Sequence, residues 1–264
     1  MKKTLLVLAL LLLPLATNAL MIAPPEPETC EPQETYTLMT FNVRVDTNKD
    51  TGNKDWDYRK DSVVEIVDKG DIVGLQEPSY SQLSYIDEQL PDYSWVGEGR
   101  SEGNLGEFNP IFYDTTKFEL LDSGTEWLSN GKIPRIYTWA KFKDCEDTFY
   151  VFNTHLSKSA KSRNKSIKKL LTGMEDIAGS ELAFLTGDMN AKPASKSYNL
   201  LTNQLIDTQT LTTHLGPKKT YTGWKKPKKR IDYIFVNQDI NVTKHRTIVT
   251  EASDHYAVKI KINK

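Results

Sequence analysis

Six short apolar segments of this 264-residue sequence each carry polar side chains within the segment or directly at its end. These side chains are Asn42, Glu77, His155, Asp188 with Asn190, Asp232, and Asp254 with His255. Carboxylates, amides and imidazoles are costly to bury unless they pair with one another or hold a bound ion. If the segments are strands of one structure, their polar ends converge at one edge and form a single site.

Strand-like apolar runs alternate with segments of helical periodicity from Tyr36 onward. Strands are predicted at residues 36–43, 71–76, 111–113, 118–120, 135–142, 148–156, 182–186, 231–236, 241–249 and 256–262. Helices are predicted at 58–68 and 79–90, around 167–177, and at 195–203. Strands and helices in this number favour an α/β fold in which two mixed sheets pack together with helices outside.

The first 19 residues have the features of a secretory signal peptide. Lys2 and Lys3 precede an apolar run from Leu5 to Leu15, and small residues for cleavage follow at 17–19. A membrane-spanning helix needs about 20 apolar residues, so an uncleaved anchor is the less favoured alternative. Residues 20–35 contain four prolines and are predicted to be a linker. Residues 36–264 are then one catalytic domain without a membrane span, monomeric, and either periplasmic or secreted.

Two cysteines, Cys30 and Cys145, occur in the sequence. In an exported protein they are predicted to form one disulfide, because oxidising compartments preserve such bonds. A metal site built on them is not expected, since neither has a closely spaced partner. A lipid-anchored Cys30 is also disfavoured, because Pro-Glu-Thr is not a small-residue processing signal.

The net charge of −1 does not by itself indicate a nucleic-acid-binding protein. Removal of residues 1–19 deletes two lysines and leaves 32 basic side chains against 35 acidic ones, a net charge of −3. Basic side chains are instead clustered in two stretches, at 158–169 and 218–230, and the second also contains Tyr221 and Trp224. Both stretches flank polar strand ends, so they are predicted to attract a polyanion. A solvated helix face is the alternative for the first stretch.

The polar set suits phosphate ester hydrolysis. Carboxylate and amide oxygens are the ligands that Mg²⁺ prefers, and a bound cation neutralises phosphoryl charge. A histidine oriented by a carboxylate can take a proton from water near neutral pH. Amide side chains can donate hydrogen bonds to phosphate oxygens.

The ordered motifs resemble those of the endonuclease/exonuclease/phosphatase superfamily, which includes deoxyribonucleases, sphingomyelinases and inositol-polyphosphate phosphatases. The resemblance rests on residues 40–44 (TFNVR), 74–77 (GLQE), 152–156 (FNTHL), 186–191 (TGDMNA), 230–236 (RIDYIFV) and 253–258 (SDHYAV). It implies a four-layered α/β sandwich of two packed mixed sheets flanked by helices. It also implies hydrolysis of a phosphate ester that depends on Mg²⁺, with Mn²⁺ as an alternative cation.

The resemblance also implies a role for each residue. Glu77, Asn42 and Asp254 match the metal site, and Asp188 and Asn190 match the pair that orients the attacking water. His255 matches the proposed general base and Asp232 the acid that orients it, while His155 matches the second histidine, near the phosphate or the leaving group. Glu107 is predicted to be the carboxylate partner of His155, Arg135 to clamp phosphate, and Trp224 to stack on substrate.

The sequence therefore predicts an exported Mg²⁺-dependent phosphodiesterase, with DNA or RNA as the leading substrate. A phosphomonoesterase or a phospholipase-C-like hydrolase, acting on sugar phosphates or lipid headgroups, is the alternative. A binding protein that has lost catalysis is disfavoured, because all motif residues are present.

Overall fold

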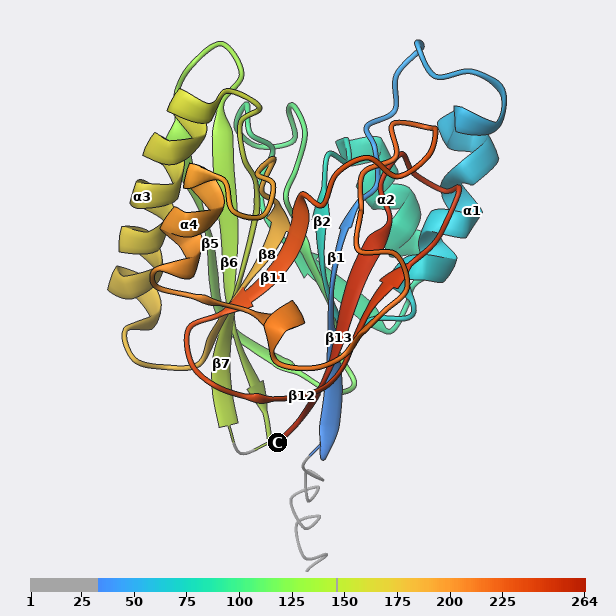
Figure 1. Ribbon diagram of the computed structural model, residues 1–264. Coiled ribbons are helices and arrows are strands. Elements are labelled where there is room, and N and C mark those ends of the chain that lie inside the picture. The colour runs from blue at the N-terminus through green and yellow to red at the C-terminus, as the bar shows by residue number, and fades with distance from the viewer. Residues whose placement is uncertain (1–32, 146) are drawn as a thin grey trace, which may run out of the picture. The chain divides into compact units, whose positions relative to one another are not determined.

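The computed structural model describes residues 33–145 and 147–264. These residues contain two β-sheets that face each other (Figure 1). The seven-stranded sheet has the order β10 (His214–Leu215), β12 (Asn241–Ile248), β13 (Ala257–Asn263), β1 (Thr35–Asn42), β2 (Ile72–Gln76), β4 (Ile111–Asp114) and β3 (Tyr93–Val96). The six-stranded sheet has the order β5 (Glu119–Ser129), β6 (Arg135–Asp144), β7 (Asp147–His155), β8 (Ala183–Asp188), β11 (Asp232–Val236) and β9 (Ile206–Asp207). Both sheets are mixed, because β1–β2, β7–β8 and β10–β12 are parallel pairs among antiparallel ones.

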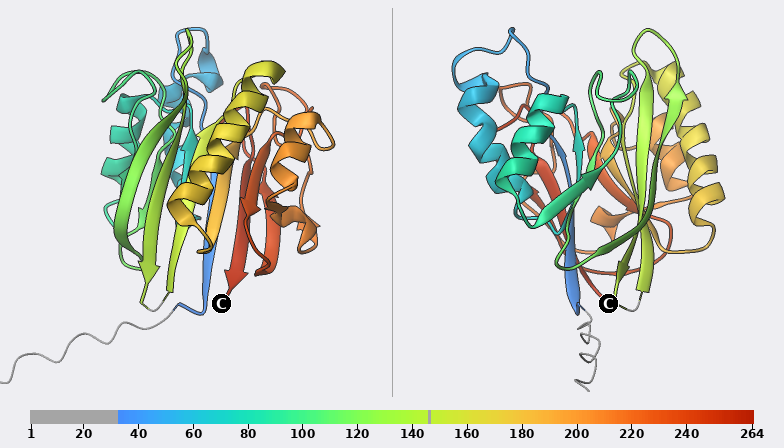
Figure 2. Two further views of the ribbon diagram at one scale, coloured as in Figure 1. Left: turned by 90° about the vertical axis from the view of Figure 1, so that its left-hand side faces the viewer. Right: turned by 180° about the vertical axis from the view of Figure 1, so that it is seen from behind.

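Helices cover the outer faces of both sheets (Figures 1 and 2). The helices α1 (Trp56–Val67) and α2 (Tyr80–Gln89) lie on the seven-stranded sheet, and α3 (Ala160–Ala178) and α4 (Lys196–Thr202) lie on the six-stranded sheet. Short 3₁₀ turns occur at Gly52–Lys54 and Thr208–Thr210. The predicted four-layered sandwich of two mixed sheets flanked by helices is confirmed.

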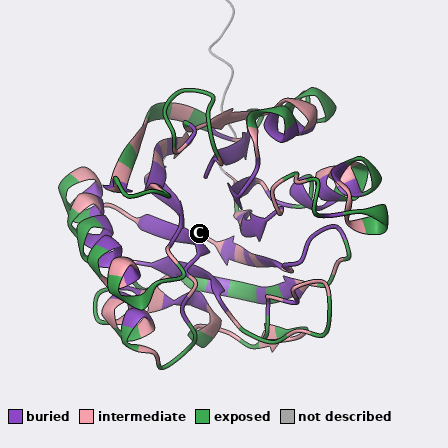
Figure 3. Ribbon diagram, turned by 90° about the horizontal axis from the view of Figure 1, so that it is seen from above, coloured by how far each residue is buried: buried purple, intermediate pink, exposed green. Residues whose placement is uncertain are grey.

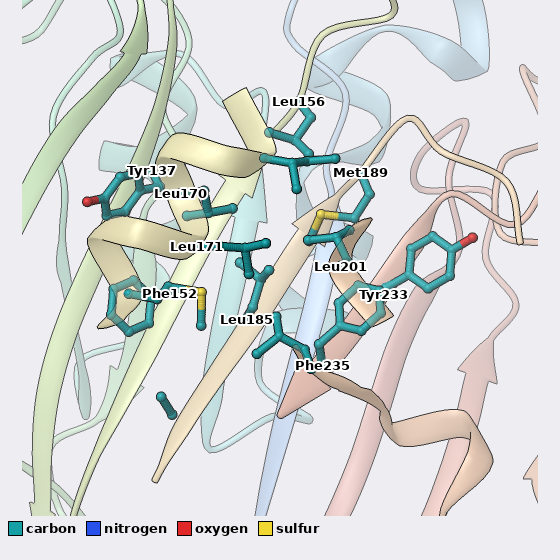
Figure 4. Packing of buried hydrophobic residues seen from close by; sticks show 14 of the residues in the cluster. Tyr137, Phe152, Leu156, Leu170, Leu171, Leu185, Met189, Leu201, Tyr233 and Phe235 are labelled. Carbon is teal, nitrogen blue, oxygen red and sulfur yellow. The ribbon is translucent and has the colours of Figure 1, made fainter. Parts of the chain in front are cut away.

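The periodicity of the sequence explains how the layers are held together. In β1, Leu38 enters the core between the sheets, whereas Met39 points to the helices α1 and α2, as alternation along a strand requires. In α3, Leu170 and Leu171 pack on Phe152 and Leu185 of the six-stranded sheet (Figure 4). Figure 3 shows that the strands are largely buried, whereas the outward faces of the helices are exposed.

Near the edge where β1, β2, β7 and β8 end, the core between the sheets is polar. The Asn153 Nδ2 donates to the carbonyl oxygens of Leu75 (2.7 Å) and Pro110 (2.8 Å), which belong to the opposite sheet. Its Oδ1 accepts from Gln76 Nε2 (2.7 Å) and Thr186 Oγ1 (3.1 Å). All these groups are buried, so Asn153 joins the two sheets through satisfied hydrogen bonds.

Most predicted elements agree with the observed ones to within about two residues, which is the usual spread of element boundaries. Three differences are larger. The helix predicted around 167–177 begins earlier, at Ala160, since its first two turns are mostly polar and carry no apolar repeat. The strand predicted at 118–120 extends to Ser129, because it pairs with β6 along its whole length. The short strands β3, β9 and β10 were not predicted, since each lies at a sheet edge and has two to four residues.

The predicted signal peptide, most of the predicted linker and Cys30 lie outside the described residues. Cys145 is disulfide-bonded, and its pairing with Cys30 stays a prediction. No helix among residues 33–145 and 147–264 is long and apolar enough to cross a membrane.

Candidate active site

The fold brings the polar strand ends to one edge of the sandwich, at the top of Figure 1. Asn42 ends β1 and Glu77 directly follows β2, both in the seven-stranded sheet. His155 ends β7 and pairs in register with Asp188, the last residue of β8. The partner strand β11 is antiparallel to β8, so it places Asp232 beside Asp188. His255, just before β13, lies at the same edge.

His255 and Asp232 form a buried ion pair across the two sheets. The His255 Nδ1 lies 3.0 Å from each oxygen of the Asp232 carboxylate. Burial alone would lower the pKa of His255, but Asp232 outweighs burial and raises it to about 10. Asp232 is fixed in turn by a short hydrogen bond from Thr220 Oγ1. The free His255 Nε2 faces Asp188 Oδ2 at 3.9 Å.

Asp188 is the centre of the cluster. Its Oδ2 accepts a hydrogen bond from Asn42 Nδ2 (3.3 Å) and lies 3.5 Å from His155 Nε2. Its Oδ1 accepts from the backbone N–H of Asn190 (2.8 Å). Burial, reinforced by the charge of Asp232, raises the pKa of Asp188 to about 7. One carboxylate thus connects both sheets and both histidines.

His155 is held as a neutral imidazole with a defined tautomer. The Asn190 Nδ2 donates to the backbone oxygen of Leu156 (2.9 Å), which fixes the orientation of this amide. The same Nδ2 faces His155 Nε2 at 3.1 Å, so Nε2 accepts and the proton of His155 lies on Nδ1. Burial, reinforced by the positive charge of Arg135, lowers the pKa of His155 well below its usual value. The buried Nδ1 has no hydrogen-bond partner among the described residues and faces Glu77 Oε1 at 3.9 Å.

Glu77, Asn42 and Asp254 supply oxygens of the kind that a hard divalent cation binds. The Glu77 carboxylate accepts from Asn42 Nδ2 (3.0 Å) and from the backbone N–H of Val45 (3.2 Å). Asp254 is mostly buried, and no described residue donates a hydrogen bond to its carboxylate. Burial raises its pKa, and the charge of Glu77 adds to this effect. A buried carboxylate without a donor among the described residues, next to the oxygens of Glu77, fits a divalent cation.

A second set of candidate metal ligands is more compact. One ligand atom from each of Asp188, Asp232 and His255 lies within 4.8 Å of the others, and all three residues are buried. The Nδ1 of His255 and both oxygens of Asp232 are already engaged with each other. The triad is therefore arranged so that it could handle a proton, and the oxygens of Glu77, Asn42 and Asp254 could hold a cation, with Asp188 bordering both sets.

Comparison with known families shows to which family the chain belongs. Residues 39–255 match the endonuclease/exonuclease/phosphatase family. The chain belongs to this family. A search of curated protein sequences found no match.

Solved structures agree with this membership. An endonuclease/exonuclease/phosphatase from Bacteroides vulgatus is 30% identical with a TM-score of 0.81, over 88% of this chain and 99% of that one. A mannosyl-6-phosphatase from Bacteroides thetaiotaomicron is 27% identical with a TM-score of 0.78, over 85% and 98% of the two chains. A Danio rerio TDP2 complexed with single-strand DNA product is 17% identical with a TM-score of 0.69, over 88% and 100%. At that identity the TDP2 likeness shows the fold alone.

Glu107, Arg135 and Trp224 make no side-chain hydrogen bond to the side chain of another predicted site residue among the described residues. Glu107 makes no hydrogen bond to His155 among the described residues; its carboxylate instead pairs with Arg100 NH2 at 2.6 Å. The Arg135 NH1 donates to the backbone oxygen of His155 (3.2 Å) and not to its imidazole. Trp224 packs against the guanidinium of Arg59, 5.9 Å from the ring centroid. The predicted Glu107–His155 pair is therefore replaced by Glu107–Arg100, because Arg100 offers a full positive charge and His155 is neutral.

The structure adds residues that the sequence interpretation missed. The ring of Tyr221 lies 4.9 Å from that of His255, and Thr220 orients Asp232. Arg44 NH1 lies 3.9 Å from Glu77 Oε2 and its Nε pairs with Asp50. Tyr221 lies in the second basic stretch, but no sequence signal places its ring against His255, and Thr220 beside it has no signal of its own. Arg44 lies in the TFNVR motif, but nothing in the local pattern places it beside Glu77.

The two basic stretches differ in their placement. In the first, Lys161, Lys165 and Lys168 lie exposed on the outer face of α3, as the alternative of a solvated helix face requires. In the second, Lys229 lies over the ring of Tyr221 (5.6 Å) and Arg230 pairs with Asp207 (2.7 Å). The other lysines of this loop, Lys218, Lys219, Lys225, Lys226 and Lys228, are exposed.

Proposed function

We propose that this protein is an exported, divalent-metal-dependent hydrolase of phosphate esters. The observation that carries the proposal is the position of Asp188, whose Oδ2 lies 3.3 to 3.9 Å from Asn42, His155 and His255. The Asp188 carboxylate thereby lies next to the proton-handling His255, the neutral His155 and the oxygens that would hold a cation. The basic and apolar pattern of residues 1–19 supports export.

Asp188 takes the proton of the attacking water, beside His255, which already carries a positive charge. Asp232 holds His255 through Nδ1, so Nε2 points to the reacting atoms together with Asp188 Oδ2. A water that touches both atoms can pass its proton to Asp188 Oδ2 as it attacks phosphorus, while the imidazolium of His255 stabilises the negative charge that develops. Asn190 holds Asp188 through its backbone N–H and His155 through its side chain, so both stay fixed during the reaction.

Glu77, Asn42 and Asp254 would hold the cation. When bound, a divalent cation neutralises charge on the phosphoryl oxygens and stabilises the leaving oxygen. Arg135 brings a further positive charge to the side of the site next to His155, where this half-buried residue is partly shielded from water. A buried guanidinium interacts with phosphate more strongly than an exposed one, because water screens it less.

A phosphomonoester of a small polar alcohol is the substrate class that we favour. The similar Bacteroides thetaiotaomicron protein is a mannosyl-6-phosphatase, and it is aligned over nearly its whole length. Trp224, expected to stack on a base, is packed on Arg59 instead. Arg230 of the basic loop is tied to Asp207, so it does not face a polyanion.

Nucleic acid is the second candidate, favoured by the exposed lysines of the 216–231 loop beside Tyr221. A polyanion that lay along this loop would reach His255 by way of Tyr221, whose ring contacts both Lys229 and His255. Binding to nucleic acid would then weaken steeply as salt is added, since each phosphate contact releases counterions.

The test is a hydrolysis panel of hexose 6-phosphates, p-nitrophenyl phosphate, bis(p-nitrophenyl) phosphate and supercoiled plasmid, each with Mg²⁺ or Mn²⁺. Chelator-treated protein and the His255→Ala variant are the controls, and circular dichroism establishes that the variant is folded. We expect the wild type with a divalent cation to release inorganic phosphate from the monoesters, and we expect neither control to do so. Plasmid nicking in place of phosphate release would select the nuclease. A folded protein that hydrolyses none of these esters would overturn the proposed function and favour a binding protein.

A further inference from the structure

A second pocket opens beside the active edge. It has a volume of about 870 Å³, and its lining includes Glu98, Arg100, Glu102, Trp127, Asn130 and Lys132. Arg100 also lines a narrow space next to Arg135 and His155, so this residue borders both regions. Figures 1 and 2 show that its two walls, the 98–107 loop and the turn between β5 and β6, rise from the edge that carries the active site. We refer to it as the side pocket.

The aromatic wall of the side pocket is fixed in place. The half-buried indole of Trp127 donates from Nε1 to the backbone oxygen of Arg100 (3.2 Å). The Arg100 guanidinium pairs with the Glu107 carboxylate (2.6 Å), and the Arg100 backbone N–H donates to the backbone oxygen of Glu107 (3.0 Å). The side pocket therefore has a rigid aromatic surface, which suits the apolar face of a ring rather than a flexible chain.

Free polar groups surround this indole. Glu98, Glu102, Asn130 and Lys132 are exposed, and none has a side-chain hydrogen bond or ion pair with another described residue. Glu102 is held with a φ of 72° by backbone hydrogen bonds from its own N–H to Gly99 (2.9 Å) and from Leu105 to its oxygen (3.1 Å). A non-glycine residue in this conformation is strained, and such strain concentrates at functional sites.

This combination of groups matches a polyhydroxylated ring. A hydroxyl group both donates and accepts, so the two carboxylates can accept from it while Asn130 and Lys132 donate to it. A nucleic-acid chain would stack equally well on an indole, but its phosphates would be repelled by Glu98 and Glu102. A lipid headgroup would bring acyl chains that need an apolar wall, and the polar groups named here do not supply one.

We propose that the side pocket binds the alcohol part of the phosphate ester, and that this alcohol is an uncharged polyhydroxylated ring such as a hexose. The inference rests on the proposed function, because it places the phosphate at His155 and Arg135 and the ring beyond Arg100. Trp127 supports the ring face, and Glu98 and Glu102 accept from its hydroxyls. The side pocket then sets which alcohol is released, and the Asp188 cluster performs the cleavage.

The experiment compares Trp127→Ala and the double variant Glu98→Gln/Glu102→Gln with the wild type. Glu126→Gln is the matched control, because Glu126 is an exposed carboxylate that alternates to the opposite side of β5 from Trp127. We expect both test variants to raise KM for mannose 6-phosphate or glucose 6-phosphate about tenfold with little change in kcat, since the pocket binds ground state and transition state alike. The inhibition constant of inorganic phosphate should stay the same, because phosphate does not reach the side pocket.

The double variant keeps the test decisive if Trp127→Ala does not fold, since its two side chains are exposed. Calorimetric titration of the His255→Ala protein with mannose 6-phosphate, with and without the same substitutions, measures binding without turnover. If the substitutions weaken binding but the wild type hydrolyses no ester, the side pocket binds the ring and the proposed function is wrong. If the substitutions change neither the hydrolysis nor the binding of hexose phosphates, the proposed role of the side pocket is wrong and the proposed function stands. The same conclusion follows if the substitutions weaken activity on a DNA substrate but not on hexose phosphates.

Discussion

The Nδ1 nitrogen of His255 lies 3.0 Å from both oxygens of Asp232, although the two residues come from different sheets. Asp232 begins β11 of the six-stranded sheet, and His255 precedes β13 of the seven-stranded sheet. This ion pair raises the pKa of His255 to about 10 and directs its Nε2 toward Asp188. The same contact thus orients the imidazole and joins the two sheets at the active edge.

Replacement of Asp232 by Asn should remove the negative charge that keeps His255 protonated. The amide oxygen would keep the hydrogen bond from Thr220, so its NH₂ group would face His255 Nδ1, and the buried imidazole would lose its positive charge. Loss of the correct protonation state in the proton-handling pair costs about 10²- to 10⁴-fold in rate, so kcat/KM for the best substrate should fall by that amount. Steady-state kinetics measure it, with Asp239→Asn on an exposed turn as the control. A fall of less than about tenfold would remove Asp232 from proton handling.

Divalent cations should stabilise the protein through Glu77. A cation at about 100 times its Kd adds about 2.7 kcal/mol to the free energy of unfolding. Thermal denaturation with and without Mg²⁺ should show this gain in the wild type, and Glu77→Gln should lose most of it. Glu65→Gln, an exposed carboxylate on α1, should retain the gain. An undiminished gain in Glu77→Gln would move the cation site to Asp188, Asp232 and His255.

Removal of Asn153 should destabilise the fold more than most polar substitutions. Asn153→Ala deletes two donors to buried carbonyl groups and leaves the Thr186 hydroxyl with one acceptor fewer. Each buried polar group that loses its partner costs about 1–3 kcal/mol, so the free energy of unfolding should fall by about 3 kcal/mol. Urea denaturation tests this, with the exposed Asn104→Ala as the control. Equal stability of the two variants would show that the hydrogen bonds of Asn153 add nothing to the stability of the contact between the sheets.

Acid should destabilise the protein through a histidine pair remote from the active edge. The Nδ1 atoms of His214 and His245 lie 2.9 Å apart, and His214 Nε2 faces the Pro217 oxygen (3.3 Å). Burial, together with the charge of His214, lowers the pKa of His245 to about 3. The unfolded chain binds this proton below pH 6.5 whereas the folded protein does not, so stability is full above pH 6.5 and is lost as the pH falls toward 3.

Between pH 7 and pH 5 the loss due to His245 should be about 2 kcal/mol. Urea denaturation at the two pH values measures it, and His245→Gln should remove most of this difference, because Gln keeps a donor for His214 without titrating. If the wild type and His245→Gln lose the same stability, the acid sensitivity lies in other groups.

The sequence predicted the site better than it predicted the surroundings of the site. Asn42, Glu77, His155, Asp188, Asp232 and His255 stand at strand ends, and strand ends of a sandwich meet at an edge, so their convergence followed from the order of apolar segments. The partners of Glu107 and Trp224 depend on where the 98–107 and 216–231 loops fold back. Glu107 pairs with Arg100 and Trp224 packs on Arg59, and no periodic pattern in the sequence indicates either contact.

The fold shows the same division. Long apolar runs such as Phe149–Phe152 and Ala183–Leu185 are buried on both faces and were recognised as strands. Residues 93–96 form the edge strand β3 only because β4 lies beside them in the structure. A strand of four residues with both polar and aromatic side chains has too little pattern of its own to be recognised.

The distribution of the cluster over two sheets has a consequence for how activity reports on the state of the molecule. Asn42, Glu77 and His255 come from one sheet, and His155, Asp188 and Asp232 from the other. A partly unfolded form that kept only the seven-stranded sheet would therefore have His255 without Asp232, and the oxygens of Glu77, Asn42 and Asp254 without Asp188 beside them. Turnover should consequently disappear with the separation of the sheets rather than with fraying of any single helix, which makes the rate of catalysis a probe of their docking.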